Sequence, residues 1–286
     1  MAVPTFDLAT VPETDRARVA SMIPNPAVAD AYVHRHIEGV YDFDILDGAV
    51  EDVENVLLSG PTGSAKSTFF RAYAAYRQLP YTVIESNASM DLSTVLGRIN
   101  PQTFEWIDGE FTLIVRYGGV GVVEEINMTH PRIGAGYHQL LAVSRRMSLP
   151  ENNETIVAGR GGLGEAQPVL LGANMNPKYE GTVRMNPALL NRFSLKMNWG
   201  YLREVEDQLC KSQRLITMAE GIRTLTEIRT PTPTNALQEF ERHYVRHGWA
   251  FAARVFASRY DDAEAAPIMR ALEANSAAIQ SELEAA

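Results

Sequence analysis

The sequence feature that most constrains this chain is a glycine-containing segment placed between a predicted strand and a predicted helix. The segment reads Gly60-Pro61-Thr62-Gly63-Ser64-Ala65-Lys66-Ser67-Thr68. The apolar run 53–58 predicts a buried strand before it, and 66–76 predicts a helix after it. Backbone N–H groups in such a turn, together with the positive end of the following helix, converge on phosphate oxygens. We therefore predict a phosphate-binding loop, in which Lys66 reaches the β- and γ-phosphates of ATP and Ser67 ligates Mg²⁺.

The loop departs at one position from the pattern G-x-x-x-x-G-K-[ST], because Ala65 stands where the pattern has its last glycine. A methyl group there restricts φ and narrows the turn. The substitution either weakens nucleotide binding or is harmless. We expect it to be tolerated, because Gly60 and Gly63 still supply the turn.

Further strands are predicted to alternate with helices up to about residue 200, which indicates an α/β fold with a parallel sheet covered on both faces. After Trp199 the apolar residues recur at three- and four-residue spacing, which is typical of helices. We expect three parts: an N-terminal segment (1–50) packed on the core, an α/β nucleotide-binding core (51–199) and an all-α lid (200–286). The predicted strands are 81–85, 120–123, 168–173 and 194–197, and the predicted helices are 27–33, 138–146, 202–218, 236–247, 250–259 and 266–283, with a turn or short strand at 42–45.

Two acids close the strand Val120–Val123, namely Glu124 and Glu125. Carboxyl ends of parallel strands gather at one edge of the sheet, so both acids are expected beside the phosphate loop. Glu124 would hold Mg²⁺ through water, and Glu125 would polarise the attacking water as a general base. Aspartate is usual at the first position, and the alternative is a solvated strand end.

Polar residues also follow the strand 168–173 and the short helix after it. Asn176, which precedes a proline, is the preferred candidate to orient the attacking water, and Asn174 is held in reserve. The alternative is an Asx turn before the proline. Arg192, after Asn186-Pro187, is predicted to reach the γ-phosphate of a neighbouring subunit, and the alternative is a surface salt bridge.

Composition narrows the class of protein further. The 286 residues carry a net charge of −9, which argues against a protein whose surface binds nucleic acid. Cys210 is the single cysteine, so a reducing, cytoplasmic setting is expected. No apolar run is long enough to span a bilayer, so no membrane association is expected. The histidines form no convincing metal-binding pattern.

In this order, the motifs resemble the AAA+ ATPases, and within them the MoxR group, most closely its CbbQ/NorQ branch. The resemblance covers roughly residues 50–200 and is carried by the loop 60–67, Asp91-Leu92, Gly97-Arg98, 106–109, 123–126, Asn176-Pro177 and 191–193. It implies Lys66 and Ser67 at the phosphates and metal, Glu124 and Glu125 as the Walker B pair, Asn176 as sensor 1 and Arg192 as the arginine finger. It further implies ATP and Mg²⁺ as cofactors, and a homo-oligomeric, hexameric ring that remodels or activates a client protein, together with a von Willebrand factor A-domain partner.

Three further segments are interpreted with the help of this resemblance. Residues 97–118 resemble an insertion directed toward the ring pore, where Phe104, Trp106 and Phe111 would contact a client; packed core is the alternative. Residues 147–167 resemble a hairpin before sensor 1, and a surface loop is the alternative. Arg145 and Arg146 lie near the subunit interface or at a solvated helix end.

The lid departs from the relatives, because the stretch Thr230–Ala236 carries no arginine, and Arg229 and Arg254 are only weak substitutes. Three functions therefore compete. The first is an ATP-hydrolysing remodeller, and the second is a nucleotide-binding scaffold with little hydrolysis. The third is a nucleic-acid motor, against which the acidic charge argues.

Overall fold

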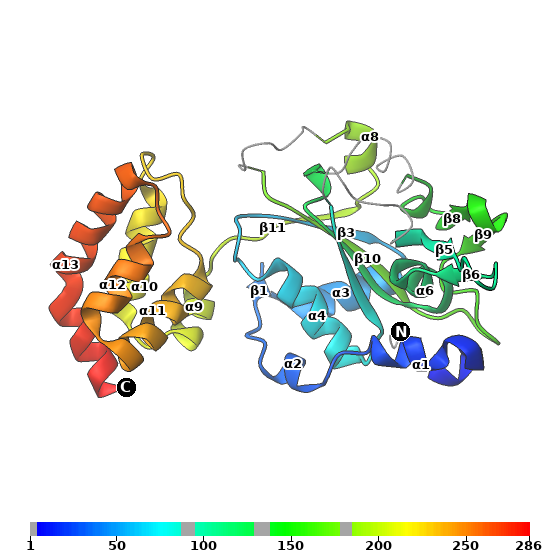
Figure 1. Cartoon of the computed structure of the whole chain (residues 1–286), viewed down its shortest axis with the longest axis horizontal. Helices are drawn as coiled ribbons and strands as arrows, with labels where there is room; N and C mark the ends of the chain where they lie inside the picture. Colours follow the sequence, from blue (N-terminus) through cyan, green and yellow to red (C-terminus); the bar gives the residue numbers. More distant parts are fainter. Residues whose placement is uncertain (1–4, 87–94, 129–137, 178–184) are drawn as a thin grey trace. The chain divides into compact units, whose positions relative to one another are not determined.

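The computed structural model describes residues 5–86, 95–128, 138–177 and 185–286 and divides the chain into two compact units (Figure 1). Met1–Gly60 and Ala65–Trp199 form the first unit. Pro61–Ser64 and Gly200–Ala286 form the second unit, so the middle of the glycine loop groups with the C-terminal helices. Asp91-Leu92, named in the family resemblance, lie outside the described residues.

The first unit contains a five-stranded sheet in which every pair of neighbouring strands is parallel. Its order is β11-β3-β10-β7-β4, so the strand before the glycine loop lies near the middle. The strands are β3 (Asn55–Ser59), β4 (Tyr81–Glu85), β7 (Gly119–Glu124), β10 (Val169–Met175) and β11 (Leu195–Asn198). The predicted parallel sheet is confirmed, with β4 at its predicted bounds.

Helices and short elements surround this sheet in the first unit. The helical elements are η1 (Leu8–Thr10), α1 (Glu13–Ser21), α2 (Ala27–Asp30), α3 (Asp42–Glu51), α4 (Lys66–Arg77), α6 (Glu110–Tyr117), η2 (Ile126–Met128), η3 (Pro150–Asn152) and α8 (Pro187–Leu190). Three antiparallel pairs complete it: β1 (His36–Ile37) with β2 (Val40–Tyr41), β5 (Gly97–Ile99) with β6 (Trp106–Asp108), and β8 (Arg146–Leu149) with β9 (Glu154–Val157).

Each face of the sheet has its own hydrophobic core, because successive residues of a strand point to opposite faces. Leu57, Val123 and Ala173 pack in one core with residues of α6 such as Phe111 and Val115. Residues of the alternate register pack on the other side against α3 and α4; they include Val56, Leu58, Val122, Leu170, Phe43, Phe69 and Phe70. The continuous apolar character of the three central strands, β3, β10 and β7, follows from this burial on both faces.

The second unit consists of helices around a separate core that contains Leu215, Phe240, Phe256 and Leu272. The helices are α9 (Arg203–Leu209), α10 (Gln213–Thr224), α11 (Thr234–His247), α12 (Trp249–Ala257) and α13 (Asp262–Ala285). No helix within the described ranges combines the length and the apolar character that a membrane crossing requires.

Three predicted elements are wrong. The segment 42–45 is the start of helix α3, whose Phe43 and Leu46 face the core. The predicted helix 138–146 ends early, and Arg146 begins strand β8. The predicted helix 202–218 is two helices, because Ser212 caps α10 by accepting a hydrogen bond from the Leu215 N–H.

Candidate nucleotide site

The glycine loop leaves β3 and enters α4 through two residues with left-handed backbone. Gly63 has φ 71° and Ala65 has φ 66°, so the loop requires positive φ at the position where the motif has its last glycine. Ala65 therefore adopts a conformation that costs an L-residue about 1 kcal/mol, and its effect on nucleotide binding stays a prediction.

Lys66, the first residue of α4, turns back onto the loop. Its Nζ donates a hydrogen bond to the Gly60 carbonyl at 2.9 Å. Burial lowers the pKa of the Lys66 ammonium to about 8, and the nearby positive charge of Arg35 adds to this, while Glu124 and Glu125 oppose it. The lysine and both carboxylates therefore lie close enough to interact electrostatically.

The strand order explains why the acidic pair reaches this lysine. Glu124 is the last residue of β7, and Glu125 follows it with a φ of 49°. Only β10 separates β7 from β3, which carries the loop. Glu124 is half-buried and Glu125 is exposed, so both carboxylates are accessible at the carboxyl edge of the sheet.

The two candidate asparagines lie at this same edge, and they differ in their contacts. The Asn174 side chain donates through Nδ2 to the Ser67 hydroxyl at 3.4 Å. Asn176 is buried, and its backbone carbonyl accepts a hydrogen bond from Asn127 Nδ2 at 3.0 Å. The structure thus brings the reserve candidate, Asn174, against the predicted metal ligand, and it adds Asn127, which the sequence alone did not single out.

Arg192 lies beyond α8, with an exposed side chain that forms no ion pair with any residue the structure describes. The surface salt bridge named as the alternative is thus not seen among the described residues, and the role of Arg192 as a finger stays a prediction. Its backbone carbonyl accepts a hydrogen bond from Asn55 Nδ2 at 2.7 Å. Asn55 Oδ1 in turn accepts from Arg145, which also donates to the carbonyls of Glu54 and Val169.

Arg145 is therefore a buried residue of the first unit, so the solvated helix end proposed for it is wrong, while its position near a subunit interface stays a prediction. Burial among neutral oxygen acceptors lowers the pKa of its guanidinium to about 10. Because Arg145 holds Asn55, and Asn55 holds the carbonyl of Arg192, the backbone of the predicted arginine finger is anchored to the start of β3.

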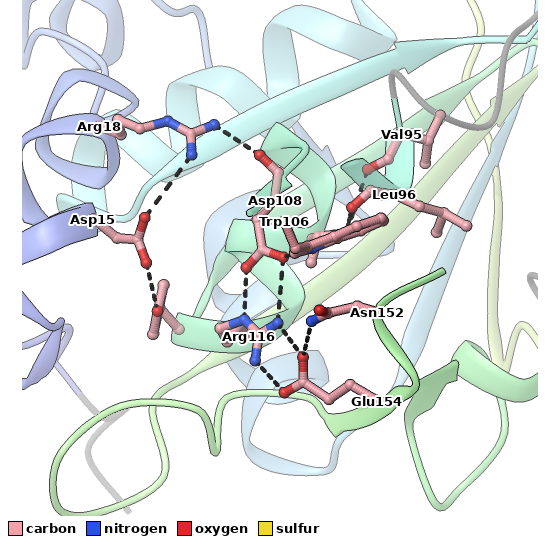
Figure 2. A network of polar contacts seen from close by, with 11 residues as sticks. Asp15, Arg18, Val95, Leu96, Trp106, Asp108, Arg116, Asn152 and Glu154 are labelled. Carbon is pink, nitrogen blue, oxygen red and sulfur yellow. Dashed lines mark hydrogen bonds and ion pairs between the residues drawn. The ribbon is translucent and has the colours of Figure 1, made fainter. Parts of the chain in front are cut away.

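The predicted client-contacting insertion is the β5–β6 hairpin followed by α6. Phe104 lies at its turn with φ 58° and is 81% exposed, whereas Phe111 is buried in the core, so the predicted contact role of Phe111 is wrong. Trp106 Nε1 donates to Asp108 at 2.6 Å, and Arg116 binds both Asp108 and Glu154 on β9 (Figure 2). The predicted hairpin before sensor 1 is β8–β9, and Arg116 ties it to the β5–β6 hairpin.

Within the second unit, Tyr201 contacts the middle of the glycine loop and Arg223 stacks on Tyr201. The Tyr201 hydroxyl donates to the Thr62 carbonyl at 2.6 Å. The Arg223 guanidinium stacks over the Tyr201 ring, and donates to both oxygens of Glu206 and to the Thr232 carbonyl. The stretch 230–236 carries no arginine of its own, but Arg223 of α10 contacts it through the Thr232 carbonyl.

A parallel sheet of this order, with a glycine loop, a lysine and two carboxylates at one edge, defines a P-loop nucleoside triphosphatase fold. Residues 55–193 match the family model of the AAA domain, dynein-related subfamily. This segment is therefore similar to an AAA domain, which agrees with the parallel sheet and glycine loop of a P-loop fold.

Relatives match part of this chain at low identity. An uncharacterized protein of Staphylococcus epidermidis is 28% identical over 191 residues, which cover 61% of this chain and 70% of the relative. The uncharacterized protein YojN of Bacillus subtilis is 30% identical over 146 residues, or 49% of this chain and 46% of YojN. Among solved structures, NtrX from Brucella abortus in complex with ADP has a TM-score of 0.43 and 16% identity, covering 82% of this chain and 51% of NtrX.

Proposed function

We propose that this chain is a Mg²⁺-dependent ATPase that works as a hexameric ring and uses ATP hydrolysis to remodel or activate a partner protein. The observation that carries the proposal is the convergence of Lys66 with Glu124 and Glu125 at one edge of the sheet. The AAA-domain match over 55–193 supports the same class of chemistry.

The residues at this edge suit a metal-bound triphosphate. Hydroxyl and carboxylate oxygens are the ligands that Mg²⁺ prefers, so Ser67 and Glu124 would hold the ion, with the phosphates and water supplying the rest. When bound, Mg²⁺ neutralises charge that develops on the phosphates. Lys66 binds the β- and γ-phosphates, Glu125 accepts the proton of the attacking water, and Asn176 orients that water.

The ring is proposed because Arg192 is exposed and bears no ion pair among the described residues. An arginine finger supplied by a neighbour stabilises transition-state charge in trans. The likeness to the MoxR group, with its CbbQ/NorQ branch, supports a client protein and a von Willebrand factor A-domain partner, in a cytoplasmic setting.

The test combines three variants with the wild-type chain. Lys66→Ala is expected to abolish Mg·ATP binding by calorimetry, and Glu125→Gln to bind ATP without releasing phosphate. Arg192→Ala is expected to bind ATP and to hydrolyse it at least about a hundredfold more slowly. Equal phosphate release by wild-type and Glu125→Gln protein would refute the proposal.

A mixing experiment tests the ring itself. Lys66→Ala subunits cannot bind nucleotide but still present Arg192, and Arg192→Ala subunits bind nucleotide but lack the finger. A mixture is therefore expected to hydrolyse ATP when neither variant does so alone. No recovery in the mixture, with both variants folded, would refute the role of Arg192 in trans.

A second candidate function is a nucleotide-binding scaffold with little hydrolysis. It is favoured by the left-handed Ala65, by glutamate at position 124 and by the lack of arginine in Thr230–Ala236. Tight ATP binding with negligible phosphate release from the assembled wild-type protein would select it. A third candidate, a nucleic-acid motor, predicts ATPase stimulation by DNA that disappears as salt rises.

A further inference from the structure

The packing of α4 on β10 determines which strand residue meets Ser67. Ser67 and Phe70 lie three apart on α4, so they point to the same side of the helix. The Phe70 ring lies against Gly172, where a Cβ would come within 2.6 Å of the ring. Two residues further along β10, on the same face of the strand, Asn174 meets Ser67. The glycine thus lets α4 approach β10 closely enough for this contact.

Asn174 has one polar atom satisfied and one without a partner. Its side chain is buried, with 3% of the residue exposed, and its Nδ2 donates to Ser67 Oγ. Its Oδ1 is buried and forms no hydrogen bond within the part of the chain that the structure describes. A buried carbonyl oxygen without a donor is costly, so its persistence calls for a ligand or ordered water.

The strand register places Asn174 level with Glu124 of the neighbouring strand. Ala173 on β10 is paired with Val123 on β7, so Asn174 and Glu124 follow at the next position of each strand. Asn174 is also paired with Leu58 on β3, the strand that leads into the glycine loop. Asn174 therefore contacts Ser67 through its amide and lies on the strand next to that of Glu124, and these two residues are the predicted holders of Mg²⁺.

We propose that Asn174 belongs to the shell of the divalent cation at this site. Its Nδ2 uses one lone pair of Ser67 Oγ and leaves the other for the cation, so Asn174 positions Ser67. Its Oδ1 accepts a hydrogen bond from a water molecule bound to the cation. This role rests on the proposed function, and it differs from that of Asn176, which acts on the attacking water.

The chemistry of the free atom favours the cation over the phosphates. A carbonyl oxygen carries only lone pairs, so it cannot bond to a phosphate oxygen, which is also an acceptor. A water molecule on a divalent cation is a strong donor and suits a buried carbonyl. Partners of metal ligands of this kind typically change metal affinity by about 10- to 100-fold when they are removed.

The experiment measures cation affinity directly. At saturating ADP, Mn²⁺ is titrated into the full chain and followed by electron paramagnetic resonance, and Mg²⁺ is titrated by calorimetry. Asn174→Leu, which keeps the branched shape of the side chain and removes both polar atoms, is expected to weaken cation binding about tenfold. ADP affinity in EDTA is expected to stay within about twofold of wild type, since the phosphate contacts of Lys66 are intact.

Asn174→Asp is not expected to weaken cation binding, in contrast to Asn174→Leu. A carboxylate at this position supplies oxygen acceptors and negative charge, so it is expected to hold the cation at least as tightly as wild type. Asn127→Leu is the matched control, because Asn127 is also buried with an unpartnered Oδ1 but donates to the Asn176 carbonyl, not to Ser67. Its cation affinity is expected to stay within about twofold of wild type.

Two results would overturn the role of Asn174. One is wild-type cation affinity in Asn174→Leu, and the other is equal weakening in Asn174→Leu and Asn174→Asp. If Asn174→Leu fails to fold, the cation affinities of Asn174→Asp and Asn127→Leu are compared instead. Weaker cation binding in Asn174→Asp than in Asn127→Leu contradicts the proposal. Failure of the proposed function looks different: wild-type and Lys66→Ala protein would then bind Mg·ADP equally poorly.

Discussion

Nucleotide affinity is expected to fall steeply with rising pH, because the Lys66 ammonium is easily deprotonated in the free protein. Burial lowers the pKa of this group to about 8. Bound phosphates restore a strong negative partner and return the pKa toward or above its ordinary value of about 10.4. The complex therefore holds a proton that the free protein loses, and raising the pH must weaken binding.

The magnitude follows from the fraction of protonated lysine. With a pKa of about 8, roughly nine-tenths of the free protein carries the proton near pH 7 and roughly one-tenth near pH 9. The dissociation constant for Mg·ADP is therefore expected to rise about tenfold over this range. Calorimetry at several pH values in buffers of different ionisation enthalpy measures both the affinity and the protons taken up on binding.

Lys66→Arg provides the control, because a guanidinium keeps its charge throughout this pH range. The affinity of Lys66→Arg for Mg·ADP is expected to be lower than that of wild type near pH 7 and to stay constant as the pH rises. A wild-type affinity that does not change between about pH 7 and about pH 9, or a slope retained in Lys66→Arg, would refute the reasoning.

Three further predictions concern stability and reactivity. Ala65→Gly relieves a left-handed alanine and is expected to stabilise the chain by about 0.5–1 kcal/mol in urea unfolding; a loss of stability contradicts the strain. Arg116→Met is expected to cost about 3 kcal/mol at neutral pH. Because Arg116 lowers the pKa of Glu154, that cost should shrink as the pH falls through this pKa; a pH-independent cost contradicts it. Burial raises the pKa of Cys210 to about 12, so a thiol reagent near pH 8 should label it only in denaturant, and rapid native labelling contradicts this.

The sheet was predictable from the sequence because its central strands are buried on both faces. Apolar runs such as 120–123 are typical of such strands, and their alternation with helices indicates parallel pairing. Once the strands are parallel, the loop and the acidic pair must follow strand ends at the same edge. The position of Lys66 near Glu124 and Glu125 is a consequence of that topology.

Other elements were not predictable, because tertiary contacts decide them. Residues 42–45 form a helix in which Asp42 is fully buried and accepts hydrogen bonds from the Tyr32 hydroxyl, His34 and the Arg35 N–H. The break before Ser212 is stabilised by Glu241 on α11, which accepts from the Ser212 N–H. These contacts join residues 7 to 29 positions apart, beyond the three- and four-residue spacing from which the helices were predicted.

The same limit applies to the site. The preference for Asn176 over Asn174 rested on the proline that follows, which is a local signal. The contact of Asn174 with Ser67 depends on how α4 packs on β10, and Gly172 makes that packing close. A glycine two residues before a buried asparagine was the available sign, but it becomes meaningful only when the facing helix is known.

The guanidinium of Arg116 gives the two hairpins a common anchorage (Figure 2). Strand β6 runs directly into α6, and the Phe111 ring of α6 rests on Gly121 of β7. The exposed Phe104 is thus connected to Glu124 through the β5–β6 hairpin, α6 and β7, which pack closely against one another. Under the proposed function, these packed elements would join a client-contacting residue, Phe104, to the nucleotide site at Glu124.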